Sequence, residues 1–130
     1  MHHLKYSVLP DNYAVCRLAP DAVVPDWGLE SCGFCSVTHA HNELSIVCPE
    51  KQVPPEIKSE RGWFCLRLEG PFPFSQSGVL ASFIGPLSTG GIPIFAISTF
   101  DTDYVLIKTE FRESALLALR EAGHELLTHR

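Results

Sequence analysis

Two cysteines and two histidines form the densest group of side chains in the chain that could bind a metal or carry redox chemistry. They are Cys32, Cys35, His39 and His41. Thiolates and imidazoles are the usual ligands of zinc, and a Cys-x-x-Cys pair is also typical of thiol redox sites. This group therefore gives one alternative for the chain, a small zinc or redox protein.

The spacing within this group argues against both uses. Residues 34–39 have the composition of a β-strand, where side chains three positions apart face opposite sides. Cys32 and Cys35 could then chelate together only if Gly33 broke the strand. Only three residues separate the cysteines from His39, whereas zinc fingers usually have about a dozen. A redox pair should open a helix, but strand-forming residues follow it here. We therefore expect no metal and no cofactor.

The remaining cysteines are Cys16, Cys48 and Cys65, and each lies in an apolar, strand-like stretch. Cysteines in such surroundings usually behave as small buried hydrophobic residues, which is the role we expect. The total of five cysteines is odd, so a disulfide framework is not expected. A reducing, cytoplasmic location fits better.

The six histidines are not accompanied by a catalytic motif. The sequence has no Gly-x-Ser-x-Gly elbow, no His-Glu-x-x-His pair and no Walker loop. His124 and His129 are expected to be solvated near the end of the chain, and His2 and His3 to form a loose terminus. The glycine-rich residues 85–91 follow a helix, so we interpret them as a helix stop. The chain is not expected to be an enzyme.

Composition excludes two further classes of protein. Hydrophobic residues make up 45% of the chain, enough for a folded core, and the net charge is −5. The ten Lys and Arg residues are scattered, whereas nucleic-acid binding needs them clustered. The longest apolar region, residues 79–97, is interrupted by Ser, Gly and Pro, so we expect no membrane span.

The second half of the chain contains two features that could bind charged groups of a ligand. A helix starting near residue 79 offers free N–H groups and the positive end of its dipole to a carboxylate. Gly78 leaves the backbone there approachable. Asp103 begins a strand beside a short turn and could hold an ammonium group. Ser77 is equally well explained as a helix cap, and Asp101 and Asp103 as turn residues that bond their own backbone.

Hydrophobic periodicity predicts the elements around these residues. The expected order is β-α-β-β-α-β, the ferredoxin-like arrangement of one antiparallel sheet with both helices on one face. The first helix is expected to stop at Gly90-Gly91, with Pro86 kinking or ending it early. The strands are predicted at 63–69, 93–98, 103–108 and 125–128, and the helices from residue 79 and over 110–122.

The first half looks like a reduced copy of the second. Residues 36–47 align with residues 96–107 at a constant offset of 60, and the helices have shrunk to a turn or two at 24–29 and 54–59. An extra strand at 4–9 should form a hairpin with 13–18 through the turn Pro10-Asp11-Asn12. It would complete the first module.

Four stretches of the second half resemble the ACT domain. They are Gly-Pro-Leu at 85–87, Gly-Ile-Pro-Ile at 91–94, Ile-Ser-Thr-Phe at 97–100 and Asp-Tyr-Val-Leu at 103–106. More narrowly, they resemble small bacterial proteins with paired ACT modules and the CASTOR arginine sensors. Residues 13–18 and 43–49 also fit the bacterial proteins, so the resemblance covers nearly the whole chain.

The resemblance implies an α+β fold of two ferredoxin-like ACT modules with their sheets side by side. The first would be a degenerate module over 1–61 and the second a full module over 62–130. ACT domains are regulatory and typically bind amino acids at the seam between two modules. The chain would be a monomer with an internal ACT pair or a homodimer.

The implied function is an amino acid sensor or regulatory module that controls a partner protein. By the same resemblance, the ligand-contacting positions are Ser77, Gly78, Val79, Thr99, Phe100 and Asp103. Phe100 could instead belong to the core. The main alternative is an ACT module that binds no ligand and serves only protein–protein interaction.

Overall fold

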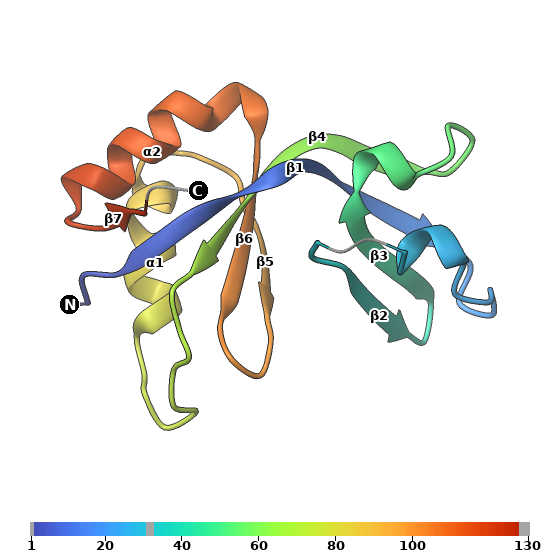
Figure 1. The fold of residues 1–130 in the computed structure, drawn as a ribbon, viewed down its shortest axis with the longest axis horizontal. Coiled ribbons are helices and arrows are strands. Elements are labelled where there is room, and N and C mark those ends of the chain that lie inside the picture. The colour runs from blue at the N-terminus through green and yellow to red at the C-terminus, as the bar shows by residue number, and fades with distance from the viewer. Residues whose placement is uncertain (1, 31–32, 128–130) are drawn as a thin grey trace. The chain divides into compact units, whose positions relative to one another are not determined.

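The computed structural model describes residues 2–30 and 33–127 (Figure 1). The chain forms two compact units. The C-terminal unit contains residues 1–9 and 64–130, and the N-terminal unit contains residues 10–63. The division differs from the expected boundary at residue 61, because the first nine residues belong with the C-terminal unit.

Two long strands contribute residues to both units. They are β1 (Lys5–Leu18) and β4 (Ser59–Leu68). The predicted hairpin through residues 10–12 is wrong, because these residues lie inside the continuous strand β1. The early part of β1 pairs elsewhere: Glu69 donates to the Lys5 carbonyl and Glu125 to the Leu4 carbonyl. Pairing on both sides outweighs the local turn preference of Pro-Asp-Asn.

The C-terminal unit has the predicted β-α-β-β-α-β order of elements, with one difference in its sheet. The strand order is β7-β1-β4-β6-β5. The start of β1 lies between the first and last strands of the module, and β7 runs parallel to it. After β4, the elements are α1 (Val79–Thr89), β5 (Phe95–Ser98), β6 (Asp103–Lys108), the 3₁₀ turn η3 (Thr109–Phe111), α2 (Arg112–Glu121) and β7 (Glu125–Leu126).

One apolar core joins the helices of the C-terminal unit to its strands. Alternate residues of β4 face this core, as expected for a strand with one buried face. Figure 1 shows α1 and α2 together beside these strands. Full burial of each large side chain contributes roughly 1.5–3 kcal/mol. The largest buried members are Tyr6, Phe64, Leu66, Leu68, Phe83, Leu87, Ile107 and Leu119.

Both helices end in a Schellman motif built on glycine. Gly91 has φ +73° and Gly123 has φ +94°, a conformation that favours glycine. Ile92 then donates to the Leu87 carbonyl, and His124 donates to the Leu119 carbonyl. The glycine stop predicted for each helix is confirmed.

Pro86 lies within α1 but does not end it, because the helix continues to Thr89. Proline has no N–H, so the carbonyl four residues earlier, that of Ser82, loses its usual helical donor. The His124 side chain fills this role, with Nε2 lying 2.9 Å from the Ser82 oxygen. The Leu4 N–H donates to His124 Nδ1 at 3.1 Å.

His124 is therefore 3% exposed, and the prediction that it is solvated is wrong. Its two ring nitrogens bond to Leu4 at the start of β1 and to Ser82 in α1. These two hydrogen bonds satisfy the ring and allow it to be buried. His129 and the end of the predicted strand 125–128 lie outside the described residues.

The N-terminal unit contains β2 (Ser36–Ala40) and β3 (Glu43–Pro49), with the strand order β2-β3-β1-β4. The beginning of β4 thus takes the place beside β1 that had been expected for residues 4–9. In the described part of this unit, the 3₁₀ turn η1 (Asp26–Gly28) falls within the short helix expected at 24–29. The second 3₁₀ turn, η2 (Glu50–Gln52), precedes the helix expected at 54–59, where none forms. No helix in the described part of the chain has the length and apolar character needed to cross a membrane.

Cys16, Cys48 and Cys65 are buried, at 1%, 0% and 0% exposure, as the sequence predicts. A hydrogen bond with the Cys48 thiol lowers the pKa of Cys16. The same hydrogen bond, together with burial, raises the pKa of Cys48. Burial alone raises the pKa of Cys65 to about 12. Cys48 and Cys65 are therefore held as neutral thiols at physiological pH.

Candidate ligand-binding site

A pocket of about 340 Å³ opens in the C-terminal unit at the N-terminal end of α1. Three segments form it: the loop after β4, the first turn of α1, and the turn between β5 and β6. Its volume lies at the lower end of the range typical of small-molecule sites, roughly 300–1,000 Å³. The lining residues are Phe72, Pro73, Phe74, Gln76, Gly78, Val79, Leu80, Ala81, Ser98, Thr99, Phe100, Asp101, Thr102 and Asp103.

The turn between β5 and β6 is fixed by hydrogen bonds to the end of β4 and the loop after it. Thr102 is 4% exposed, and its Oγ1 donates to the Leu68 carbonyl at 2.8 Å. The Phe72 N–H donates to the Asp101 carbonyl at 3.0 Å. A Cβ at position 70 would lie 2.8 Å from that carbonyl oxygen, so the close approach requires Gly70. The turn therefore holds its side chains in place before any ligand arrives.

The N-terminal end of α1 presents backbone donors to this pocket. Gly78 is the N-cap, with φ +82° and no side-chain capping hydrogen bond. The first N–H that bonds back to the Gly78 carbonyl is that of Ser82. The N–H groups of Val79, Leu80 and Ala81 precede the helical ladder and are available to an anion. The suggestion that Ser77 caps the helix is wrong, because Gly78 in the left-handed conformation is the N-cap and no side chain caps it.

His2 contacts the loop that precedes α1. Its Nε2 lies 3.0 Å from the Ser77 carbonyl oxygen, and its backbone N–H donates to Ser82 Oγ at 3.4 Å. The start of the chain is thus tied to α1, and the expectation of a loose terminus is wrong for this residue. Pairing of the neighbouring strand β1 places His2 beside α1. The sequence alone does not reveal this placement.

The pocket carries negative side-chain charge. Asp101 and Asp103 line it, and none of its described lining residues is Lys, Arg or His. The Ser98 hydroxyl donates to one oxygen of Asp103, which orients that carboxylate and leaves its second oxygen for another partner. The site therefore combines carboxylates on one side with helix N–H groups on the other.

Two exposed aromatic rings stand at the pocket. Phe74 is 77% exposed and Phe100 is 79% exposed. They meet edge to face, with ring centroids 4.9 Å apart. Phe100 therefore does not belong to the core, which had been the alternative for it. Exposed rings in contact with each other form a ready apolar surface for a ligand or a partner.

The structure brings five of the six predicted site residues into this one pocket: Gly78, Val79, Thr99, Phe100 and Asp103. Ser77 is adjacent to the pocket but does not line it. Contact of these residues with a ligand stays a prediction. Phe72, Phe74 and Thr102 also line the pocket, and the sequence did not indicate them as site residues. Phenylalanines alternating with prolines in an otherwise polar loop could have indicated an exposed aromatic surface.

The cysteine and histidine group of the N-terminal unit gives no metal centre within the described residues. No three His, Cys, Asp or Glu side chains there are arranged to hold an ion. Cys35 is half-buried beside β3, and Cys32 lies outside the described residues, so their joint use stays untested.

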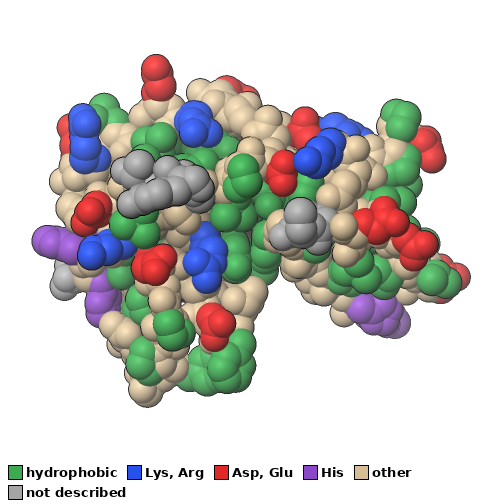
Figure 2. Space-filling model, viewed as in Figure 1, with side chains coloured by type: hydrophobic (Ala, Val, Ile, Leu, Met, Phe, Trp, Pro, Cys, Tyr) green, Lys and Arg blue, Asp and Glu red, His purple; other side chains and the backbone are tan. Residues whose placement is uncertain are grey.

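The charged side chains of the surface are mixed in sign. On the face shown in Figure 2, Lys and Arg side chains are interspersed with Asp and Glu side chains.

The chain has a mixed α/β fold with two helices and a pocket at the N-terminal end of α1. Comparison with known families identifies the domain that carries this pocket. An ACT domain model matches residues 58–121, and a second model, described as an N-terminal domain, matches residues 11–56. A search of curated proteins finds no match.

A solved structure matches the chain over its whole length. Protein Atu0741 from Agobacterium tumefaciens is 38% identical, with a TM-score of 0.93, over 100% of this chain and 97% of that one. The chain therefore belongs to the same family as Atu0741, with an ACT domain at residues 58–121.

Two more distant structures share the fold. Protein VC0802 from Vibrio cholerae, described as a possible transport protein, is 19% identical with a TM-score of 0.74, over 92% of this chain and 90% of that one. The regulatory subunit of aspartate kinase from Thermus thermophilus is 15% identical with a TM-score of 0.56, over 86% of this chain and 93% of that one.

Proposed function

We propose that this chain is a non-catalytic regulatory module that binds an amino acid in the pocket at the start of α1. One observation carries the proposal: the first turn of α1 and two carboxylates, Asp101 and Asp103, line the same pocket, and none of its described lining residues is Lys, Arg or His. A zwitterion needs both kinds of partner at once. A simple anion would be repelled by the carboxylates, and a simple cation would leave the helix N–H groups unused.

Each site residue has a role in this proposal. The ligand carboxylate accepts hydrogen bonds from the N–H groups of Val79 and its neighbours, with Gly78 allowing close approach. The ligand ammonium group binds Asp103. Thr99 holds the turn beside Asp103, because its N–H and its hydroxyl both donate to the Thr102 carbonyl. The Phe100 ring covers the ligand's side chain.

The proposal extends to the organisation of the whole chain. The N-terminal unit would be a degenerate ACT copy, supported by its β2-β3-β1-β4 strand order and by the 60-residue offset in the sequence. Binding would regulate a partner protein. A closer kinship with arginine sensors, and with it arginine as the ligand, stays a prediction.

The test is thermal unfolding of the protein with each of the twenty amino acids in turn. A ligand that binds only the folded state at 100 times its Kd adds about 2.7 kcal/mol of stability. We expect one amino acid, or a few related ones, to raise Tm by several degrees.

Asp103→Asn should weaken this binding about tenfold or more, because it removes a charge-assisted hydrogen bond. The matched control, Asp101→Asn, should have a smaller effect, since Asp101 lies in the turn and not at the strand start. Equal affinity in wild type and Asp103→Asn would rule out the assigned ammonium site.

A second candidate is an ACT module that binds only another protein. The exposure of Phe74 and Phe100, 77% and 79%, favours it. A flat thermal response to all twenty amino acids would select this alternative.

A further inference from the structure

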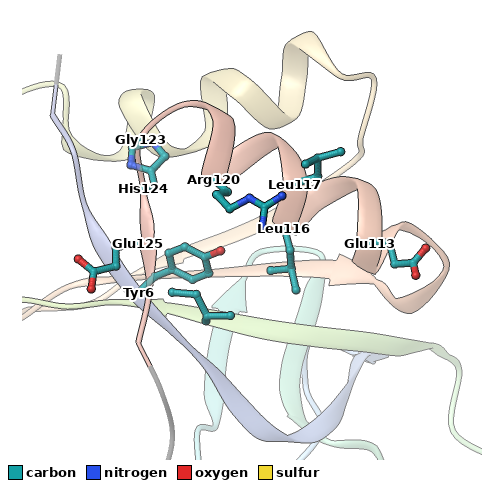
Figure 3. Close-up of a pocket in the computed structure, with 9 residues that line it drawn as sticks. Tyr6, Glu113, Leu116, Leu117, Arg120, Gly123, His124 and Glu125 are labelled. Carbon is teal, nitrogen blue, oxygen red and sulfur yellow. The ribbon is translucent and has the colours of Figure 1, made fainter.

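A second and larger pocket lies in the C-terminal unit between α2 and the edge formed by β7 and β1 (Figure 3). Its volume is about 640 Å³, within the range typical of small-molecule sites, roughly 300–1,000 Å³. It shares no lining residue with the pocket at the start of α1. The lining residues are Tyr6, Glu113, Leu116, Leu117, Arg120, Gly123, His124, Glu125 and Leu126.

The walls of this pocket are largely apolar. Leu116 and Leu117 come from α2, Leu126 from β7, and the Tyr6 ring from β1. Leu117 is 46% exposed and Leu126 is 45% exposed, although both are large aliphatic side chains. The pocket thus offers a ligand an apolar surface that the fold itself leaves uncovered, worth about 25 cal/mol per Å² buried.

Two polar groups project into this apolar space. Figure 3 shows the Arg120 guanidinium reaching from α2 above the Tyr6 ring, with the Tyr6 hydroxyl directed toward the same region. Arg120 has no ion pair among the described residues. The Tyr6 side chain is only 1% exposed, and it lines this pocket. Burial raises the pKa of Tyr6, so the hydroxyl keeps its proton and can donate it.

The charges of the pocket limit what can bind. Glu113 and Glu125 lie at opposite ends of the group of side chains in Figure 3, with Arg120 between them. One central positive charge between two peripheral negative charges suits a single small anionic group. A dianion would face repulsion from both glutamates.

We propose that this second pocket binds a small monocarboxylate with an apolar body. The carboxylate lies between the Arg120 guanidinium and the Tyr6 hydroxyl, both of which donate hydrogen bonds to it. The apolar body packs on Leu116, Leu117 and Leu126. This site is independent of the amino acid site and of its proposed function.

The experiment is a titration of ¹⁵N-labelled full-length protein with hexanoate, followed by amide chemical shifts. Hexanol and hexylamine serve as neutral and cationic probes with the same apolar body. Hexanoate should give saturable shifts at Leu117, Arg120, Gly123 and Leu126, and should bind at least fivefold more tightly than either of the other two.

Two substitutions test the polar contacts. Arg120→Gln should weaken hexanoate binding about tenfold and leave hexanol binding unchanged, because only the charge is lost. Tyr6→Phe, which keeps the ring and removes the hydroxyl, should weaken hexanoate binding several-fold. The matched controls are Arg112→Gln, which lies on the same helix outside the pocket, and Tyr104→Phe, whose hydroxyl accepts from Arg67. Both controls should bind hexanoate as the wild type does.

Three results would overturn the proposal: no saturable shifts at the pocket with hexanoate, equal or tighter binding of hexylamine, or unchanged affinity in Arg120→Gln. Arg120 is exposed, so this variant should fold as wild type, and its amide spectrum shows whether it does. A failure here would leave the amino acid site untouched, because the two pockets share no residue.

Discussion

At the level of single residues, the His124 side chain replaces a backbone hydrogen bond that α1 lacks. Pro86 removes the helical donor of the Ser82 carbonyl, and His124 Nε2 supplies another at 2.9 Å. Nδ1 must then accept from Leu4, so the neutral tautomer with its proton on Nε2 is required. The sequence places this histidine after a helix stop but does not show that it turns inward.

His124→Ala should lower the free energy of unfolding by about 2–4 kcal/mol, because it leaves two buried backbone groups without partners and opens a cavity. Urea unfolding measures this loss. His39→Ala is the control, since His39 is exposed and should change stability by less than about 0.5 kcal/mol.

Adding Pro86→Ala to His124→Ala restores an N–H for the Ser82 carbonyl, so the double variant should recover part of the loss. Strict additivity of the two substitutions would contradict the assigned role of His124.

The raised pKa of Cys65 should make the free energy of unfolding depend on pH in the alkaline range. Its pKa is about 12 in the folded state, against an ordinary value of 9.0. Between these values the folded state holds a proton that the unfolded state has lost. Stability therefore falls as pH rises above about 9, by up to about 1.4 kcal/mol per pH unit from this one thiol.

Urea unfolding of wild type and Cys65→Ala at pH 8, 9.5 and 10.5 isolates the contribution of Cys65. The difference in stability between them should change with pH in favour of the alanine variant. A difference independent of pH would show that Cys65 is not desolvated.

At the scale of the element, glycine positions and hydrophobic spacing were reliable guides. The stops after α1 and α2 follow from Gly91 and Gly123, because a left-handed residue is a local demand that the sequence displays. The start of α1 was less readable, since Gly78 caps the helix where Ser77 was expected to. Pro86 does not end α1, for a different reason. His124, which is distant in the sequence, provides a hydrogen bond to the Ser82 carbonyl, and local sequence rules do not take such a contact into account.

Gly123→Ala should destabilise the protein by about 1–2 kcal/mol. Its φ of +94° is strained for alanine, and the new Cβ would lie 3.0 Å from the His3 ring. Gly85→Ala is the matched control, because it lies inside α1 with nothing within 4 Å of its Cβ. It should stabilise by up to about 1 kcal/mol through helix propensity. Thermal or urea unfolding that showed the same sign for both variants would contradict this account of the helix end.

At the scale of the whole molecule, the sequence predicted the element order of the C-terminal unit but not how its sheet is assembled. The insertion of the first strand between β4 and β7 depends on pairing between residues over a hundred positions apart, such as Lys5 and Glu125. Periodicity carries no such information. For the same reason, the sequence did not show that the first residues of the chain cluster with the C-terminal unit.

The candidate site was more predictable than the topology. The β5–β6 turn and the helix start are both local features, and the resemblance to ACT domains pointed to them. Their meeting in one pocket depends on Thr102 and Phe72, which hold the turn against the end of β4 and the loop that follows it. These two residues have no local signature, and the sequence did not identify them.

The most direct measurement for the central claim is an amide chemical-shift titration with the amino acid that most raises Tm. We expect saturable shifts concentrated at Gly78, Val79, Thr99 and Asp103, and their loss in Asp103→Asn. Shifts confined to other parts of the chain, or none with any of the twenty amino acids, would contradict it.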